Sequence, residues 1–235
     1  MKKFMIFAGL LFLVFSVMAQ KSWVGFSSDK AQQPVITVVE QNENQLILDV
    51  SIAGMYVSEV TDSEQNFQRL ELLPFQSTKE VGKPELPMLG EIIGVPGNRL
   101  VNVQVLEQET IKLENYQIYP FQTPTTDNPG GHDKAFVMDE DFYKLSKNYP
   151  LNQVYIDGVG IWRDLKVANL HLVPFKYNPV SKDLEVTTSI KIKVTFSGVD
   201  TELSVNRSKS VSPVFYNMYK TNLINFESMG FSKSL

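Results

Sequence analysis

Hydrophobic and polar residues alternate along most of the chain from Pro34 onward, and this alternation predicts an all-β fold. It is strictest over residues 101–105, 168–172 and 190–196. Strict alternation places one face of a strand in a core and the other in water. Further strand candidates are residues 34–39, 45–51, 56–60, 67–73, 88–95 and 111–118. Many short strands with almost no helical periodicity predict an antiparallel β-sandwich.

Turn residues separate these strands and mark one long loop. The Asn-Pro-containing stretch 178–183 and the polar stretch 42–44 each lie between two strands and predict hairpins. Residues 123–134 contain two prolines and two glycines without a strand pattern, which indicates an exposed loop. A short helix is expected after it, within residues 139–147.

The C-terminal part has a different period. Ser212 is a suitable N-cap, Pro213 suits the first helical position, and Gly230 would end the element. Between them an apolar stripe recurs at helical spacing: Phe215, Tyr219, Leu223 and Phe226. This predicts a short amphipathic helix within residues 212–235, which the sandwich at 34–198 and a polar linker at 199–211 precede. We expect the helix to have little to pack on within this chain, since its stripe has no evident partner.

The N-terminus has the pattern of a Sec-type signal peptide. Lys2 and Lys3 precede an apolar run at 4–15, and small residues lead up to Ala19 and Gln20. We expect cleavage between Ala19 and Gln20, and residues 20–33 to form a lead-in to the sandwich. The alternative, a retained membrane anchor, is less favoured because no second span follows. Export would take the chain to the periplasm, the cell surface or the extracellular space, with no membrane attachment after signal removal.

Composition excludes several kinds of chemistry. The 235-residue chain has no cysteine, two histidines and a formal net charge of −4. Thiol catalysis and thiolate metal sites are therefore absent, and the acidic balance argues against a nucleic-acid partner. No serine lies in a nucleophile-elbow context, and His132, His171 and the acidic residues form no nucleophile–base–orienter set. We predict no catalytic residues and no cofactor, and we expect His171 to lie on the solvated face of its strand.

A loose group of acidic residues is a candidate calcium site. Its members are Asp127, Asp133, Asp139, Glu140 and Asp141. Calcium requires many oxygen ligands, but the spacing here matches no EF-hand loop. Acidic residues around an exposed loop are more often simply solvated, so we predict no metal site.

Three motifs in order carry a resemblance to a known family. They are Gly-Lys-Pro-Glu-Leu-Pro at 82–87, Tyr-Pro at 149–150, and the block at 162–179 that ends in Pro-Phe-Lys-Tyr-Asn-Pro and is followed by Leu-Glu-Val at 184–186. In this order they resemble the propeptide of gingipain-type cysteine peptidases, over roughly residues 35–196. The rigid Pro-x-x-Pro tract reads as an architectural lead-in to the strand at 88–95, because proline fixes φ and removes a donor.

The resemblance implies a role as well as a fold. It implies a β-sandwich that folds ahead of a peptidase domain, caps its active-site cleft, and is removed by cleavage at basic residues. Lys134 becomes the candidate inhibitory residue, which suits a lysine-preferring partner. Arg207 and Lys209 become candidate maturation cleavage sites. The implied partner is a cognate cysteine peptidase domain, in cis or in trans, which would hold the catalytic Cys and His that this chain lacks.

Two other functions stay open on the sequence. The chain could be an adhesion or carbohydrate-binding module in which Trp23 or Trp162 stacks on sugar rings, although a tryptophan at the start of a strand is commonly part of a core. It could also be a scaffold or export passenger without an activity of its own.

Overall fold

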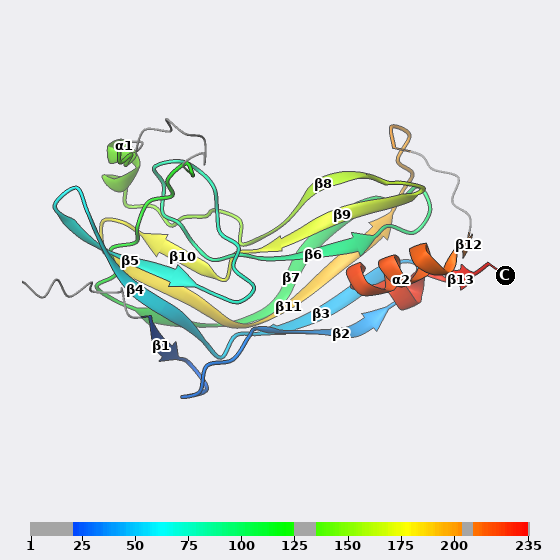
Figure 1. Ribbon diagram of the computed structural model, residues 1–235, viewed down its shortest axis with the longest axis horizontal. Helices are drawn as coiled ribbons and strands as arrows, with labels where there is room; N and C mark the ends of the chain where they lie inside the picture. Colours follow the sequence, from blue (N-terminus) through cyan, green and yellow to red (C-terminus); the bar gives the residue numbers. More distant parts are fainter. Residues whose placement is uncertain (1–20, 125–134, 204–208, 235) are drawn as a thin grey trace, which may run out of the picture.

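A five-stranded antiparallel sheet runs along the whole length of the molecule (Figure 1). The computed structural model describes residues 21–124, 135–203 and 209–234. The sheet has the order β10-β11-β3-β2, and β7 pairs with β11 along nearly the whole length of β11. Its strands are β2 (Val35–Gln41), β3 (Gln45–Ser51), β7 (Leu100–Leu113), β10 (Phe175–Asn178) and β11 (Asp183–Ser197). The two predicted hairpins, β2–β3 and β10–β11, are confirmed.

Two three-stranded sheets complete the sandwich. One has the order β6-β9-β8, with β6 (Leu89–Gly94), β8 (Val154–Trp162) and β9 (Leu165–Leu172). The other has the order β1-β4-β5, with β1 (Ser22–Gly25), β4 (Gly54–Asp62) and β5 (Gln65–Glu71). One continuous core joins the sheets, and residues such as Leu48, Leu170 and Ile192 are almost fully buried in it. Burial of this apolar surface stabilises the fold, and the predicted antiparallel sandwich is confirmed.

Several local predictions are corrected. β7 is one strand, not two, because it stays paired with β11 along its whole length and accommodates two register irregularities. β8 was missed because a bulge between Asp157 and Gly160 interrupts its alternation. His171 is half-buried, not solvated: its ring centroid lies 5.2 Å from that of Tyr155, and desolvation lowers its pKa.

Both tryptophans have engaged rings. The Trp23 ring packs edge-on to Tyr56 at 5.2 Å, and its indole N–H donates to the Ser28 carbonyl. The Trp162 ring packs edge-on to Tyr219 at 5.7 Å. Both tryptophans are half-buried, and these ring contacts lie within the fold.

Two helices flank the sheets at opposite ends of the molecule (Figure 1). The short helix α1 (Glu140–Tyr143) begins where expected, and the Asp139 side chain caps it by accepting from the Phe142 N–H. At the other end, Ser212 is the N-cap of α2 (Pro213–Asn222), and the 3₁₀ helix η1 (Phe226–Met229) ends at Gly230 in the left-handed conformation. Among the described residues, no helix combines the length and the hydrophobicity needed to cross a membrane.

The expectation that the C-terminal helix lacks a partner is wrong. Tyr219 is fully buried and Leu223 is 4% exposed, in a cluster with Leu165 of β9. The sheet β6-β9-β8 supplies the apolar surface on which the stripe packs. The sequence shows the stripe of such a helix but not the strand that receives it.

Candidate functional site

The predicted site residues fall mostly outside the described part of the chain. Ala19, Gln20, Lys134 and Arg207 lie outside it, and Lys209 lies inside and is exposed. The structure nevertheless describes both stems of the loop that carries Lys134, at 121–124 and 135–139. It also describes both ends of the linker. The stems bear on the expected inhibitory role of Lys134, and the linker ends bear on the expected cleavage at Arg207 or Lys209.

The Gly-Lys-Pro-Glu-Leu-Pro tract holds both stems of the loop. The Gly82 N–H donates to the Phe121 carbonyl of the first stem at 2.9 Å, and the Gly82 carbonyl accepts from the Asp139 N–H of the second at 3.0 Å. Phe121 N–H donates back to Lys83 at 2.8 Å. Gly82 has φ +80°, and a Cβ there would lie 2.9 Å from the Asp139 nitrogen. Glycine is therefore required on both conformational and steric grounds.

A side-chain amide joins the stems directly. Gln122 Nε2 donates to the Val137 carbonyl at 2.8 Å, and Gln122 Oε1 accepts from the Val137 N–H at 2.9 Å. The same amide nitrogen donates to the Pro120 carbonyl at 2.9 Å. One glutamine thereby takes the place of a backbone pair between the two stems. The sequence does not predict this role of Gln122, because a lone glutamine in a loop has no distinctive pattern.

Aromatic packing against β5 and Tyr119 fixes the second stem. The Phe136 ring lies 5.7 Å from Phe67 of β5 and 6.0 Å from Tyr119, measured between ring centroids. The Arg69 guanidinium lies 4.7 Å from the centroid of the Tyr119 ring. Tyr119 donates to Asp62 at 2.7 Å, and desolvation is the main cause that raises the pKa of its phenol to about 12. Phe136 is thus held against side chains that are themselves fixed.

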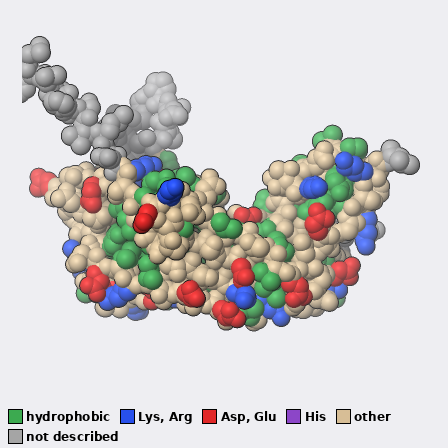
Figure 2. All heavy atoms as spheres, turned by 90° about the horizontal axis from the view of Figure 1, so that it is seen from below, with side chains coloured by type: hydrophobic (Ala, Val, Ile, Leu, Met, Phe, Trp, Pro, Cys, Tyr) green, Lys and Arg blue, Asp and Glu red, His purple; other side chains and the backbone are tan. Residues whose placement is uncertain are grey.

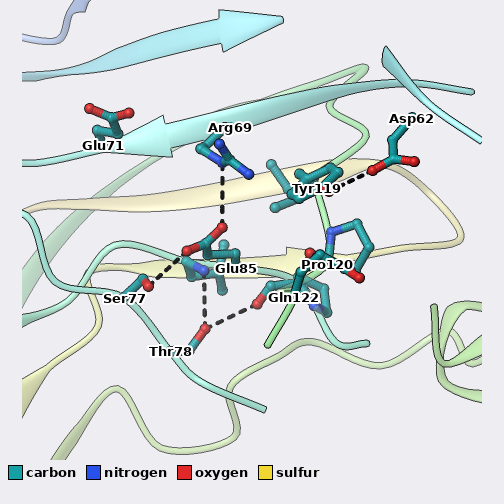
Figure 3. Close-up of polar contacts among 12 residues, drawn as sticks. Asp62, Arg69, Glu71, Ser77, Thr78, Glu85, Tyr119, Pro120 and Gln122 are labelled. Carbon is teal, nitrogen blue, oxygen red and sulfur yellow. Dashed lines mark hydrogen bonds and ion pairs between the residues drawn. The ribbon is translucent and has the colours of Figure 1, made fainter. Parts of the chain in front are cut away.

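Glu85 is a buried carboxylate that contacts several residues near the second stem (Figure 3). Its carboxylate accepts from the Ser77 hydroxyl at 3.0 Å and lies 3.5 Å from Arg69 Nε. Its N–H donates to the Tyr119 carbonyl at 2.9 Å. The residue is only 8% exposed, so these partners compensate the desolvation of its charge.

Thr78 ties the two prolines of the tract to the preceding segment. Its hydroxyl donates to the Pro84 carbonyl at 3.0 Å and accepts from the Leu86 N–H at 3.1 Å (Figure 3). Pro84 forms a β-bridge with Pro120, and Pro87 forms one with Ser77. The tract therefore lies as an ordered edge that leads into β6, and its side chains serve structure.

The acidic group near the loop is engaged locally. Asp139 caps α1, and Glu140 pairs with Lys144 at 3.3 Å. Asp127, His132 and Asp133 lie outside the described residues. Within residues 21–124, 135–203 and 209–234, no three His, Asp or Glu side chains are arranged as metal ligands.

The first end of the linker is tied to a buried lysine. Lys166 of β9 is fully buried, and its ammonium donates to Asp200 Oδ2 at 2.5 Å and to the Arg99 carbonyl at 2.8 Å. Asp200 Oδ1 accepts from the N–H groups of Glu202 and Leu203 at 3.0 and 3.1 Å. The hydrogen bond from Lys166 is the main cause that lowers the pKa of Asp200. Lys166 lies on the same face of β9 as the buried apolar side chains, but a lysine is seldom buried, so the sequence does not predict this pair.

The second end of the linker is paired as a strand. Lys209 is exposed, but its carbonyl accepts from the Ser232 N–H at 2.9 Å. The next residues form β12 (Ser210–Val211), which pairs with β13 (Ser232–Lys233) in parallel. The linker therefore begins and ends at anchored backbone.

The pair at the first linker end predicts a pH-dependent stability. A carboxyl whose pKa is lowered in the folded state stabilises it above the unfolded-state pKa, and this contribution is lost as pH falls through the folded-state pKa. Asp200→Asn should therefore lower the urea midpoint at neutral pH, and the deficit should shrink below about pH 4, where ordinary aspartates protonate. Urea unfolding of both proteins across this range checks it, with exposed Asp29→Asn as the matched control. A deficit that is constant with pH would contradict the role of the carboxylate charge.

Comparison with known sequences gives one family and a set of relatives. The family model Propeptide_C25 matches residues 27–234. Lys-gingipain from Porphyromonas gingivalis is 28% identical over 150 residues, which cover 61% of this chain and 9% of that protein. Gingipain R2 from the same organism is 21% identical over 204 residues, which cover 86% of this chain and 27% of that protein. The chain thus spans only a small part of the length of these relatives.

Comparison with solved structures gives the same fold. A structure described as a complex of Porphyromonas gingivalis RgpB pro- and mature domains contains a chain that matches with a TM-score of 0.69 and 21% identity, covering 82% of this chain and 97% of that one. A structure on the zymogenic latency of gingipain K matches with a TM-score of 0.66 and 20% identity, covering 77% and 100%. The resemblance seen in the sequence motifs is confirmed. Because the family model covers nearly the whole described chain, the protein belongs to the Propeptide_C25 family, the propeptides of gingipain-type peptidases.

Proposed function

We propose that this chain is the inhibitory pro-domain and folding assistant of a gingipain-type cysteine peptidase. The observation that carries the proposal is the doubly tied base of the loop at 125–134. Gly82 bonds to both stems, and Gln122 joins them. A loop whose ends are fixed by its scaffold loses less conformational entropy on binding, so it is suited to insertion into a cleft.

The relatives support this reading. One matching structure is described as a complex of pro- and mature domains, and the other concerns zymogenic latency. By that analogy the partner is a cognate peptidase domain, joined in cis or added in trans. Lys134 directly precedes the second stem in the sequence and would place its ammonium in the specificity pocket of a lysine-preferring partner.

The described surface is compatible with a folded protein partner. In Figure 2 the upper outline of the molecule is hollowed between two raised ends, and acidic and basic side chains are interspersed over the face in view. Nucleic acid would favour a uniformly basic surface, and the face in view is not one.

Maturation and export complete the proposal. A Sec-type signal at 1–19 would direct export, with cleavage between Ala19 and Gln20. Cleavage at Arg207 or Lys209 in the linker would open the zymogen. Lys209 is the less favoured of the two, because its carbonyl accepts a hydrogen bond from the Ser232 N–H. Before cleavage, the pro-domain would fold first and template the peptidase domain.

The direct test is inhibition in trans. The chain from residue 20 to 235 should inhibit a lysine-preferring gingipain-type peptidase more tightly than an arginine-preferring one, because the ammonium and guanidinium heads differ in geometry and hydrogen bonding. Inhibition constants against both enzymes provide the measurement. Absence of inhibition of either enzyme, together with binding on a glycan array, would contradict the proposal and favour a carbohydrate-binding module.

A further inference from the structure

The C-terminal segment 209–234 has an apolar cluster of its own, distinct from the main core. Its fully or almost fully buried members are Leu165, Val211, Tyr219, Leu223, Phe226 and Met229. Only Leu165 belongs to the sandwich; the other five belong to the segment. The Tyr219 and Phe231 rings stack at 4.9 Å, and Tyr219 donates to Asp164 at 2.8 Å. The segment therefore packs as a unit on the sheet β6-β9-β8.

One buried amide locks this unit to the end of β6. Asn225 is fully buried, its Oδ1 accepts from the Gly94 N–H at 2.8 Å, and its Nδ2 donates to the Gly94 carbonyl at 2.8 Å. Met229 fills the space at Gly94, where a Cβ would lie 3.0 Å from its sulfur. The Ile224 N–H donates to the Ile92 carbonyl at 3.0 Å. The segment thus completes backbone hydrogen bonds that β6 would otherwise lack at this edge.

The segment is also closed on itself at its two ends. Ser232 N–H donates to the Lys209 carbonyl at 2.9 Å, and Ser234 N–H donates to the Val211 carbonyl at 2.8 Å. The guanidinium of Arg163, a residue of the sandwich, lies 3.6 Å from the centroid of the Phe215 ring. Each of these contacts lies within 209–234 or between it and the sandwich, so none depends on covalent continuity through residues 204–208.

We propose that a cut in the linker at 204–208 leaves residues 209–235 bound to the sandwich as a non-covalent ligand of the edge of β6 and the face of β9. This rests on the proposed function in one respect, namely that the linker is a maturation site. A peptidase domain joined after residue 235 would then stay tethered to the pro-domain after the cut. Linker cleavage and release are accordingly two separate steps, and release requires the C-terminal segment to leave the sheet β6-β9-β8.

The experiment uses the chain from residue 20 to 235 with residues 204–208 replaced by the recognition sequence of a site-specific protease. After complete cleavage, size-exclusion chromatography in native buffer should show both fragments in one peak, and denaturant should separate them. Elution of the short fragment by itself in native buffer would overturn the proposal. No peptidase partner is involved, so this outcome is independent of whether the chain inhibits.

A matched pair of variants tests the contact between the C-terminal segment and β6. In the cleaved protein, exchange of a fluorescent peptide of residues 209–235 should be about tenfold faster or more in Asn225→Ala, because two buried backbone groups of Gly94 lose their partner. Asn217→Ala, the same substitution at an exposed position of α2, should leave the exchange rate unchanged. Equal rates in the two variants would overturn the assigned role of Asn225. Circular dichroism of the uncut variants checks that they fold. If a variant does not fold, the co-elution experiment on the cleaved parent protein still tests the proposal.

Inhibition separates this inference from the proposed function. If the chain inhibits, the cleaved and uncleaved forms should have equal inhibition constants. If neither form inhibits while the fragments still elute together, the proposed function fails, but the non-covalent binding of residues 209–235 to the sandwich stands.

Discussion

Replacing Lys134 by alanine should weaken inhibition of a lysine-preferring gingipain-type peptidase by about 100-fold. Truncating one partner of a charge pair buried in an interface costs about 2–5 kcal/mol, because the other charge is left without its partner, and about 1.4 kcal/mol corresponds to a tenfold change. The effect should appear mainly in the dissociation rate, as for most changes within one interface. Inhibition constants and dissociation rates of the two proteins provide the measurement.

Two variants make the Lys134 experiment specific. Lys144→Ala removes an exposed lysine whose pair with Glu140 lies on the surface, and this change should affect inhibition little. Lys134→Arg should shift the preference toward an arginine-preferring enzyme, since it keeps the charge but changes the head group. Inhibition by Lys134→Ala equal to that of the parent protein would exclude Lys134 from the specificity pocket and leave family membership untouched.

Leu86→Ala should lower the free energy of unfolding by about 2–5 kcal/mol, the range for deletion of a fully buried leucine side chain. Leu86 has no exposed surface and packs in the main core, directly after Glu85. Leu151→Ala is the matched control, because Leu151 is 87% exposed and its loss should change stability by less than about 0.5 kcal/mol. Urea unfolding at neutral pH measures both. A Leu86→Ala effect as small as that of the control would contradict the view of the tract as core.

The Leu86 variant should also loosen the loop base. Leu86 and Gly82 lie in one tract, and the Asp139 N–H bonds to the Gly82 carbonyl. Hydrogen exchange at the Asp139 amide should therefore accelerate in Leu86→Ala under native conditions, because local opening of the tract releases this bond. Unchanged exchange at Asp139 alongside a large loss of stability would show that the tract and the loop stem open independently.

The sequence by itself determined the fold class and the family. Alternation identified β3, β9 and β11, because each has one buried and one solvated face, and turn residues located the two hairpins. Ser212, Pro213 and Gly230 located the C-terminal helical segment. The backbone preferences of proline and glycine act locally, although the Ser212 side chain makes no capping hydrogen bond. The ordered motifs carried the family resemblance that the comparisons confirmed.

Tertiary structure decided what lies opposite each of these elements. The bulge in β8 hid a strand from any search for period two, and the burial of Lys166 depends on Asp200 and Arg99, which lie far away in the sequence. The docking of the C-terminal segment on β6 includes a hydrogen bond between Gly94 and Asn225, which are 131 residues apart. Likewise, Gly82 serves the loop only because the fold brings it to Asp139. Local patterns encode the conformation and the exposed face of a segment, whereas its partner follows from packing of the whole chain.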